Sequence, residues 1–389
     1  QAEDGIRDRS PSRGLGDVYK RQDKHRMMWL VKTSSVHEGF PLMRVISRPS
    51  TARCTLAMYV SFLLGEPHSP TGNRLAEVME ISHDSVNRFL LREDYTPRDL
   101  FEEVRSGPSL TGGTISVDDS VLDKPYSQLM AFVGHFWSGK HHGVVKGINL
   151  ITLYYTDPHG HHQPLDYRIY DKAANKTKND YFQEMLAEVL AWGLQPAFVT
   201  GDSWYGGAAN LKMIKNHHRG FLLALESNRR VSVEKGQWLQ VQQLAIPEDG
   251  SLVYLRGFGT VKVFRKRLKN QPRHYALYQP NDEEWVAFDR PAFLKLHDQH
   301  WQIEQYHRTL KQVCHIEHFQ VRQPTAIRNH LFAAICGYVQ LQRLQATDVI
   351  RNCYRLQREL FNEVIASFIQ AFAPNLGHLN PQFQPAVNA

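Results

Sequence analysis

Hydrophobic positions recur at helical spacing between residues 51 and 110. One apolar stripe includes Leu56, Tyr59 and Leu63, and two shorter stripes follow on either side of a turn at Ser82. Spacings of three and four residues place such side chains on one face of a helix. Two short helices joined by a tight turn are typical of a helix-turn-helix, although plain helical packing modules share the pattern. We therefore predict a helical domain over residues 51–110, with Asn87 and Arg88 on the outer face of the second short helix, where they would contact DNA.

The pattern changes to strand-like alternation at Thr111. Apolar runs bounded by turns predict further strands over residues 143–155, 163–169 and 196–202. They also predict one clear helix over residues 181–192. Alternating strands and helices of this kind form a mixed α/β sheet. We expect this domain to span residues 111–228 and 291–345.

Residues 229–290 are rich in short β patterns separated by turns, which predicts a β-rich insertion between the two parts of the α/β domain. Helical patterns begin again near Pro291 and Thr325, and the tail over 346–389 is also predicted to be largely helical. Residues 23–50 lack periodicity and form a leader. The first 22 residues look like a translated sequencing adapter, so we leave them out of the predicted fold.

Carboxylates stand at the ends of two predicted strands. Asp118 and Asp119 close one strand and Asp202 closes another, and the carboxyl ends of strands are where open α/β folds bind their ligands. The helix from Pro291 adds Glu304. The same helical face carries mostly basic or titratable side chains, namely His297, Trp301, Arg308 and Lys311. A carboxylate among such groups suits a divalent metal ion together with a phosphate.

Composition narrows the choice of partner. The 389-residue chain carries 46 Lys and Arg against 39 Asp and Glu, a formal charge of +7, which favours a polyanion. No apolar run reaches the roughly 18–20 residues that a membrane helix needs, so we expect no membrane partner. The four cysteines lack the spacing of a zinc site or a disulfide framework, which fits a reducing cytoplasm.

Several ordered strings, among them SVDDSVLDKP, HFWSGKHHGVVKGINLIT, TGDSWYGG and HWQIEQYHRTLKQ, resemble bacterial insertion-sequence transposases of the Asp-Asp-Glu type. The resemblance runs from about residue 51 to about residue 345. It implies a ribonuclease-H-like mixed sheet with flanking helices, a β-rich insertion between the second Asp and the Glu, and an N-terminal helix-turn-helix domain.

The resemblance also implies roles for particular residues. The second Asp corresponds to Asp202 and the Glu to Glu304. The first carboxylate is usually followed by Thr or Ser, which selects Asp119 and leaves Asp118 as the alternative. The family's Lys corresponds to Lys311, and His297 and His300 stand where the family has Tyr and Arg, so they could hold the terminal phosphates if protonated. Arg308, on the same helical face as Glu304, and Lys146 are further expected DNA contacts.

Three carboxylates imply two Mg²⁺ or Mn²⁺ ions that support in-line displacement at phosphorus. The expected function is thus cut-and-paste DNA transposition, in which double-stranded transposon ends are cleaved and then joined to target DNA. A homodimer on paired ends and a cytoplasmic, nucleoid-associated location are expected. The alternatives are a non-catalytic DNA-binding relative and a stand-alone nuclease of the same fold.

Overall fold

The computed structural model describes residues 52–68, 70–234, 236–268, 271–281, 285 and 288–356, together with 362, 365–367 and 370. The expected adapter and leader segments, residues 1–22 and 23–50, lie outside these residues. Most of the tail over 346–389 does so too.

Four short helices form the first described part of the chain, and polar side chains cap each of them. They are α2 (Leu56–Gly65), α3 (Gly72–Met79), α4 (His83–Arg92) and α5 (Pro97–Val104). Ser82 accepts a hydrogen bond from the backbone of Ser85 at the start of α4, and Glu80 turns the chain with a φ of 53°. The pair α3 and α4 therefore has the predicted helix-turn-helix pattern.

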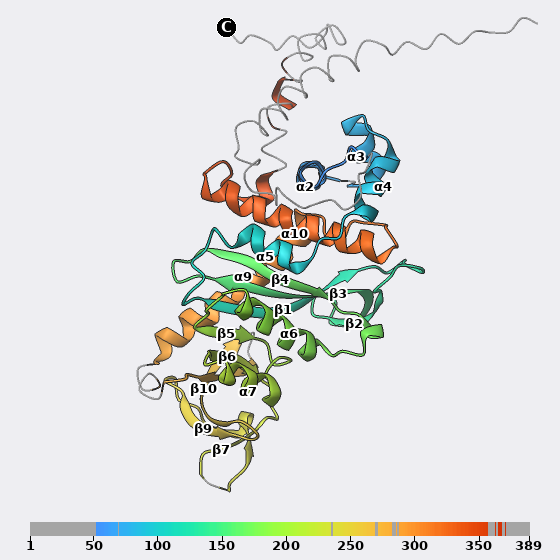
Figure 1. Cartoon of the computed structure of the whole chain (residues 1–389). Helices are drawn as coiled ribbons and strands as arrows, with labels where there is room; N and C mark the ends of the chain where they lie inside the picture. Colours follow the sequence, from blue (N-terminus) through green and yellow to red (C-terminus); the bar gives the residue numbers. More distant parts are fainter. Residues whose placement is uncertain are drawn as a thin grey trace, which may run out of the picture. The chain divides into compact units, whose positions relative to one another are not determined.

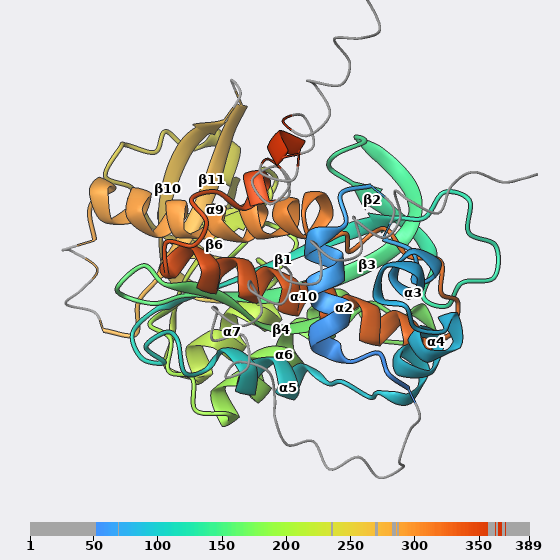
Figure 2. The same ribbon diagram turned by 90° about the horizontal axis from the view of Figure 1, so that it is seen from above.

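A long buried helix, α10 (Pro324–Ala346), packs against α2 and α4 (Figure 2). Asn329 donates hydrogen bonds to the carbonyl oxygens of Leu90 and Glu93, at 2.7 and 2.6 Å. The Tyr59 hydroxyl lies 2.8 Å from Nδ1 of His330. Because these polar atoms are buried, their hydrogen bonds hold α2 and α4 in one register against α10.

The central sheet has ribonuclease-H-like topology (Figure 1). Strands β1 (Thr114–Asp123), β3 (Gly143–Thr156) and β4 (His162–Ile169) are antiparallel neighbours. Strands β5 (Phe198–Gly201) and β6 (Gly220–Leu225) continue the sheet parallel to β1, in the order β4-β3-β1-β5-β6. The short β2 (Gly134–Ser138) forms a hairpin with the start of β3. These strands confirm the predicted mixed α/β class.

Helices lie on both faces of this sheet. Helix α9 (Arg290–Gln312) packs on β1 and β5, whereas α6 (Lys178–Ala191) packs on β3 and β4, and α7 (Ala208–Asn216) packs on β6. A 3-10 turn over Lys172–Ala174 precedes α6. Thr177 and Asp180 form a capping box, so α6 begins three residues before the predicted start at Tyr181.

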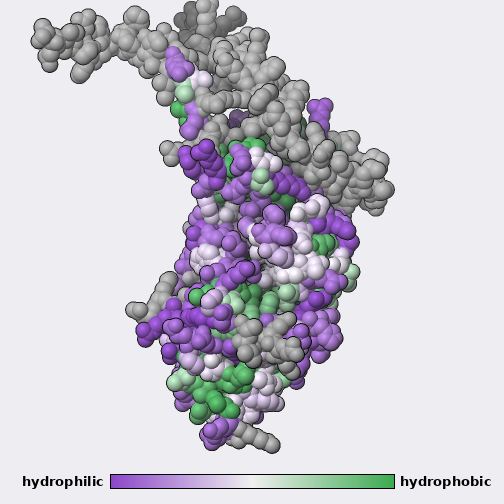
Figure 3. All heavy atoms as spheres, turned by 90° about the vertical axis from the view of Figure 1, so that its left-hand side faces the viewer, coloured by the Kyte–Doolittle hydropathy of each residue, from purple (hydrophilic) through white to green (hydrophobic). Residues whose placement is uncertain are grey.

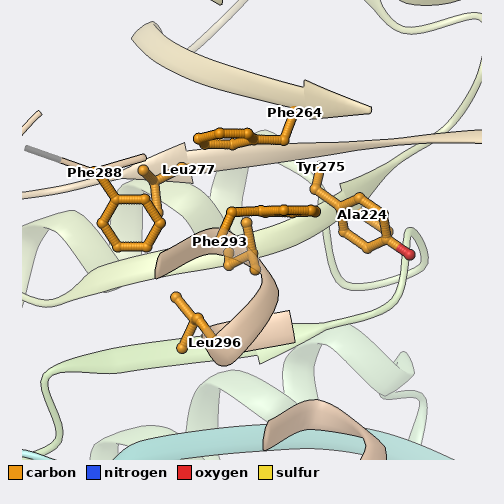
Figure 4. Close-up of a cluster of buried hydrophobic side chains, with 8 residues drawn as sticks. Ala224, Phe264, Tyr275, Leu277, Phe288, Phe293 and Leu296 are labelled. Atoms are coloured by element: carbon orange, nitrogen blue, oxygen red, sulfur yellow. The ribbon is translucent and has the colours of Figure 1, made fainter. Parts of the chain in front are cut away.

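The β-rich segment extends the same sheet. Its strands are β7 (Arg230–Ser232), β8 (Leu239–Gln240), β9 (Ser251–Leu255), β10 (Gly259–Leu268) and β11 (Gln271–Tyr278). β11 pairs antiparallel with β6, so the described strands make one eleven-stranded sheet. The first half of α9 covers β10 and β11 through an aromatic cluster in which Phe264 and Phe293 stack at 4.6 Å (Figure 4). This packing holds the helix that carries Glu304.

Exposed apolar side chains gather on the part of the insertion farthest from the helices α2–α4 (Figure 3). The large ones there are Val233, Trp238, Leu239, Leu252 and Tyr254. Trp285, in contrast, is buried, and its indole N–H donates to the carbonyl of Gln279 at 3.1 Å. Trp285 thus belongs to the core of the insertion.

Candidate active site

The two neighbouring aspartates of β1 point to opposite faces of the sheet, because side chains alternate along a strand. The face of Asp118 also carries Ser116, whose hydroxyl lies 2.9 Å from Oγ1 of Thr200 on β5. Thr200 in turn lies 3.4 Å from Nδ1 of His300 on α9. Asp118 therefore lies on the face that α9 covers.

Helix α9 is pinned above this face by polar contacts along its length. Asp289 caps its first turn by accepting a hydrogen bond from the backbone of Ala292. Immediately before His300, Gln299 accepts a hydrogen bond at 2.7 Å from the hydroxyl of Thr114 at the start of β1. The next turns carry Glu304 and His307. The helix thereby aligns a carboxylate and two imidazoles with β1.

His307 makes a direct contact with Asp118. Its Nδ1 lies 3.5 Å from Oδ2 of Asp118, and its Nε2 is a buried atom without a hydrogen-bond partner in the described part of the chain. Burial alone would raise the pKa of Asp118, but the hydrogen bond from His307 and the charges of His307 and His300 hold that pKa below its usual value. Asp118 is consequently ionised and held in one orientation.

Asp202 and Glu304 experience the charge of Asp118. Asp202 follows β5, the neighbour of β1, and accepts a hydrogen bond from the backbone N–H of Trp204 at 2.9 Å. Burial, together with the neighbouring charges of Asp118 and Asp119, raises its pKa to about 7. Partial loss of hydration and the charge of Asp118 also raise the pKa of Glu304. Both carboxyls therefore lie close enough to Asp118 to be affected by its negative charge.

Asp119 has a different environment, on the face that α6 covers. Its Oδ2 accepts hydrogen bonds from Asn149 at 2.6 Å and from the Lys178 ammonium at 2.7 Å. Its Oδ1 accepts from the hydroxyl of Tyr205 at 3.2 Å. Asp119 was expected to be the first carboxylate, with Asp118 as the alternative. Strand alternation turns Asp119 away from α9 and brings Asp118 to the face that α9 covers.

The basic residues of α9 differ in their surroundings. Arg308, one turn after Glu304, is exposed, and its charge lowers the pKa of that carboxyl. Lys311 instead donates to the carbonyl of Val121 at 2.6 Å and pairs with Glu317 at 3.2 Å. Arg308 is thus accessible to a bound anion, whereas Lys311 fastens the end of α9 to β1.

The two histidines expected to hold phosphates lie in partly buried networks. Nε2 of His297 is 3.2 Å from the Tyr275 hydroxyl, and Nδ1 is 3.0 Å from the ammonium of Lys266. Burial lowers the pKa of both His297 and His300, which disfavours in each the protonated form that the expected phosphate contact requires.

The remaining expected DNA contacts lie outside the carboxylate cluster. On α4, Arg88 is exposed, and the amide of Asn87 lies 3.3 Å from Nδ1 of His83. Lys146 on β3 donates to the backbone carbonyl of Ser127. The structure therefore separates these residues into two surfaces, one on α4 and one on the hairpin of β2 and β3.

The site supplies ligands that suit a hard divalent ion. Carboxylate oxygens are preferred by Mg²⁺ and Mn²⁺, and the charge of Asp118 raises the pKa of both Asp202 and Glu304, a repulsion that a bound cation would relieve. Among the described residues, no group of three or more His, Cys, Asp and Glu is already drawn together tightly enough to enclose an ion. The donor set fits such an ion, although its oxygens are not preassembled around one.

Two residues of this region were missed at the level of sequence. His307 falls on the apolar stripe of α9, where packing is the simplest interpretation, but its position three residues after Glu304 is a usable signal, because residues at this spacing are neighbours on a helix. Lys178 lies in a polar segment that gives no comparable signal. Only the fold brings it beside Asp119.

One protein family matches the part of the chain that carries the three carboxylates. Residues 112–340 match the family described as "Transposase DDE domain". Among solved structures, the chain is similar to a piggyBac transposase synaptic complex with hairpin DNA, with 12% identity and a TM-score of 0.43 over 89% of this chain and 81% of that one. It is also similar to a Drosophila P element transposase strand transfer complex, with 10% identity and a TM-score of 0.28 over 57% and 53%. No curated protein matches its sequence.

Within the described residues, no helix has the length and apolar character required to cross a membrane.

The family match extends from the start of β1 into α10 and so includes all the strands and helices that form the carboxylate site. It covers more than half of the chain. The chain therefore belongs to the family of transposases with a DDE domain, and its function is DNA transposition.

Proposed function

We propose that the chain is a metal-dependent DNA endonuclease and strand transferase whose three carboxylates are Asp118, Asp202 and Glu304. The observation that carries this proposal is their electrostatic coupling: the charge of Asp118 raises the pKa of both other carboxyls, although the three come from different elements. The proposal takes Asp118 as the first carboxylate in place of Asp119. Asp119 acts as a positioning residue that ties β1 to β3, α6 and the loop after β5.

Asp118, Asp202 and Glu304 would hold the divalent ions, Mg²⁺ or Mn²⁺. When bound, such ions supply Lewis acids that stabilise the charge developing on the phosphodiester oxygens. His307 keeps Asp118 oriented, and the exposed Arg308 contacts a phosphate of the bound DNA. Lys311 and the buried histidines keep α9 in place.

Two in-line displacements at phosphorus account for cleavage of one strand at a transposon end and for its transfer to the target. In the first, water attacks the phosphodiester at the transposon end, and the bond to the 3′ oxygen breaks to release a 3′-hydroxyl. In the second, that hydroxyl attacks a target phosphodiester and displaces another 3′ oxygen. The same carboxylates serve both steps, so no covalent enzyme intermediate is required.

We further propose that α4 contacts double-stranded DNA through Arg88 and Asn87, and that a homodimer brings two transposon ends together in the bacterial cytoplasm at the nucleoid. The helix-turn-helix geometry of α3 and α4 supports the first point. The positive net charge of the chain supports binding to DNA in general.

A cleavage assay tests the proposed function. A labelled duplex carrying the terminal repeats that flank the gene is incubated with the full chain and Mg²⁺, or with EDTA. We expect cleavage only with Mg²⁺ and its loss in Asp202→Asn and Glu304→Gln. Asp298→Asn is the matched control, because Asp298 is an exposed carboxylate on the same helix as Glu304. Cleavage by both site variants at the parental rate would refute the assignment.

A further inference from the structure

The hairpin of β2 and β3 carries an exposed face that the proposed carboxylate site does not use. Trp137 lies opposite Val144 in the ladder, and His135 lies opposite Lys146. Residues opposite one another share a face of the hairpin, so these four side chains lie together. Trp137 and Val144 are each 65% exposed. Contiguous exposure of large apolar side chains marks an interaction surface.

The loop between β1 and β2 extends this face. Lys146 donates to the carbonyl of Ser127 in that loop, which brings the loop beside the hairpin. The residues on either side of Ser127 include Tyr126 and Leu129, which are 94% and 76% exposed. We call the whole set the hairpin surface; it consists of Tyr126, Leu129, His135, Trp137, Val144 and Lys146.

The opposite face of the hairpin is already packed. The ring of Phe136 meets that of Tyr170 edge-on at 5.7 Å, and the ammonium of Lys172 lies 5.1 Å from the Phe136 ring centre. Phe136 is accordingly buried. The exposure of the hairpin surface is thus one-sided, as expected of a strand pair that uses one face for folding and the other for a partner.

The hairpin surface continues the face of the sheet that carries Asp118. On β3, the side chain of Asn149 reaches Asp119 on the α6 face, whereas the ring of Tyr154 meets that of Tyr306 on α9 at 5.1 Å. The pairing of β3 with β1 and β2 has no register shift between these positions and the hairpin. By alternation, Val144 and Lys146 lie on the side of Tyr154, which is also the side of Asp118.

The hairpin also bends back toward the end of β1. At its turn, the Lys140 ammonium lies 3.1 Å from the Asp123 carboxylate, and Nε2 of His141 lies 2.9 Å from it. Asp123 is five residues beyond Asp118 on β1, a distance of about 17 Å at about 3.4 Å per residue. Duplex DNA rises by about 3.4 Å per base pair along each strand, so this distance corresponds to about five base pairs.

The charges beside the hairpin surface favour a polyanion as its occupant. Lys140 and Lys146 supply positive charge beside the hairpin surface. Two carboxylates, Asp123 and Glu317, lie near these lysines or near other basic side chains of the region. Asp123 is paired with Lys140 and His141, and Glu317 is paired with Lys311. The Lys140 side chain is largely exposed, so a phosphate can take the place of Asp123 with little loss of hydration. Exposed aromatic and apolar groups beside such cations suit the sugars and bases of DNA.

We propose that the hairpin surface holds the DNA duplex about five base pairs from the phosphodiester that is cleaved at Asp118. The proposal rests on the proposed function for the position of that phosphodiester. Trp137 and Tyr126 contact the sugars and bases of the duplex, and Lys140 contacts a phosphate. The surface acts as a second grip on the duplex, separate from α4.

Binding measurements on shortened duplexes test this proposal. The probes carry the terminal repeat and the cleavage position and are shortened one base pair at a time from either end. We expect the affinity of the parent to fall when one arm becomes shorter than about five base pairs. The double variant Trp137→Ala, Lys140→Gln should bind the longest duplex about tenfold or more weakly and should no longer respond to shortening of that arm. Its salt slope, log affinity against log salt concentration, should be smaller by about one.

Lys212→Gln is the matched control, because Lys212 is an exposed lysine on α7. Equal affinity and salt slope in the double variant and the parent would overturn the proposal, provided that both give the same circular dichroism spectrum. Unchanged DNA affinity with loss of a dimer in light scattering would overturn it as well, in favour of a contact between two copies. Mg²⁺-dependent cleavage of the shortest duplex by the parent separates failure of this proposal from failure of the proposed function.

Discussion

Exchanging each of the two neighbouring aspartates for asparagine separates catalysis from structure at this site. Asp118→Asn keeps the shape of the side chain but removes the charge that acts on Asp202 and Glu304. Loss of a carboxylate ligand removes several kcal/mol of metal-derived stabilisation of the transition state, which lowers the cleavage rate by about a thousandfold or more. The free energy of unfolding should change little, because the contact with His307 is long at 3.5 Å.

Asp119→Asn should have the opposite effect. The carboxylate of Asp119 accepts from Lys178, Asn149 and Tyr205, and an amide group cannot accept all these hydrogen bonds. Hydrogen bonds to a charged group contribute about 1.5–3 kcal/mol each, so we expect a loss of about 3 kcal/mol of stability after partial rearrangement. At a temperature where the variant is folded, its cleavage rate should stay within about tenfold of the parent, a change of about 1.4 kcal/mol in the barrier.

The assay combines two measurements on each variant. Calorimetry gives the melting temperature, which should fall by about 4 °C in Asp119→Asn and hardly move in Asp118→Asn. Single-turnover cleavage of the terminal duplex with Mg²⁺ gives the rate. If Asp119→Asn abolished cleavage while remaining stable, and Asp118→Asn cleaved normally, our reasoning about strand alternation would be refuted.

Three further predictions follow from individual residues. Arg308→Gln should weaken binding of terminal DNA several-fold and reduce the salt slope by about one in a fluorescence anisotropy titration, and an unchanged slope would contradict a phosphate contact. Gly147→Ala should destabilise the fold by about 2–3 kcal/mol in urea unfolding, because the new methyl group would lie 2.4 Å from the carbonyl oxygen of Leu122; parental stability would contradict that packing. Burial lowers the pKa of His330 to about 3, whereas in the unfolded chain its pKa is near the ordinary value of about 6.5. The folded protein should therefore lose stability as the pH falls below about 6.5, by up to about 1.4 kcal/mol per pH unit. His330→Asn should flatten this dependence when the free energy of unfolding is measured from about pH 7 to about pH 4.5, and an unchanged dependence would contradict the assignment.

Much of the fold was predictable from local patterns. The change from helical spacing to alternation at Thr111 marks the real boundary before β1, and Phe293, Leu296 and Ile303 recur at the helical spacing of the face that α9 buries. These signals are periodic and therefore robust. The pairing of β11 with β6, which merges the insertion with the central sheet, was not predictable, because nothing in the sequence of a strand specifies its non-local partner.

The site was predictable in its residue types but not in its orientation. Alternation placed Asp118 and Asp119 on opposite faces, yet the face that α9 covers is decided only by long-range packing of Phe293 and its neighbours on β10 and β11. Asp119 was chosen as the first carboxylate because Ser120 follows it, as Thr or Ser usually does in the family. The roles of the lysines were equally hard to predict. Lys311 and Lys146 were expected to contact DNA, but each donates a hydrogen bond to a backbone carbonyl that is distant in the sequence.

A crystal of the full chain with a terminal duplex, Mn²⁺ and an uncleavable phosphorothioate at the cleavage position would test the central claim most directly. Anomalous scattering locates Mn²⁺ without assumptions about its ligands. Our account predicts that the anomalous peaks lie within coordination distance of Asp118, Asp202 and Glu304, with Asp119 still bonded to Lys178. Peaks on Asp119, with Asp118 left without metal, would contradict it.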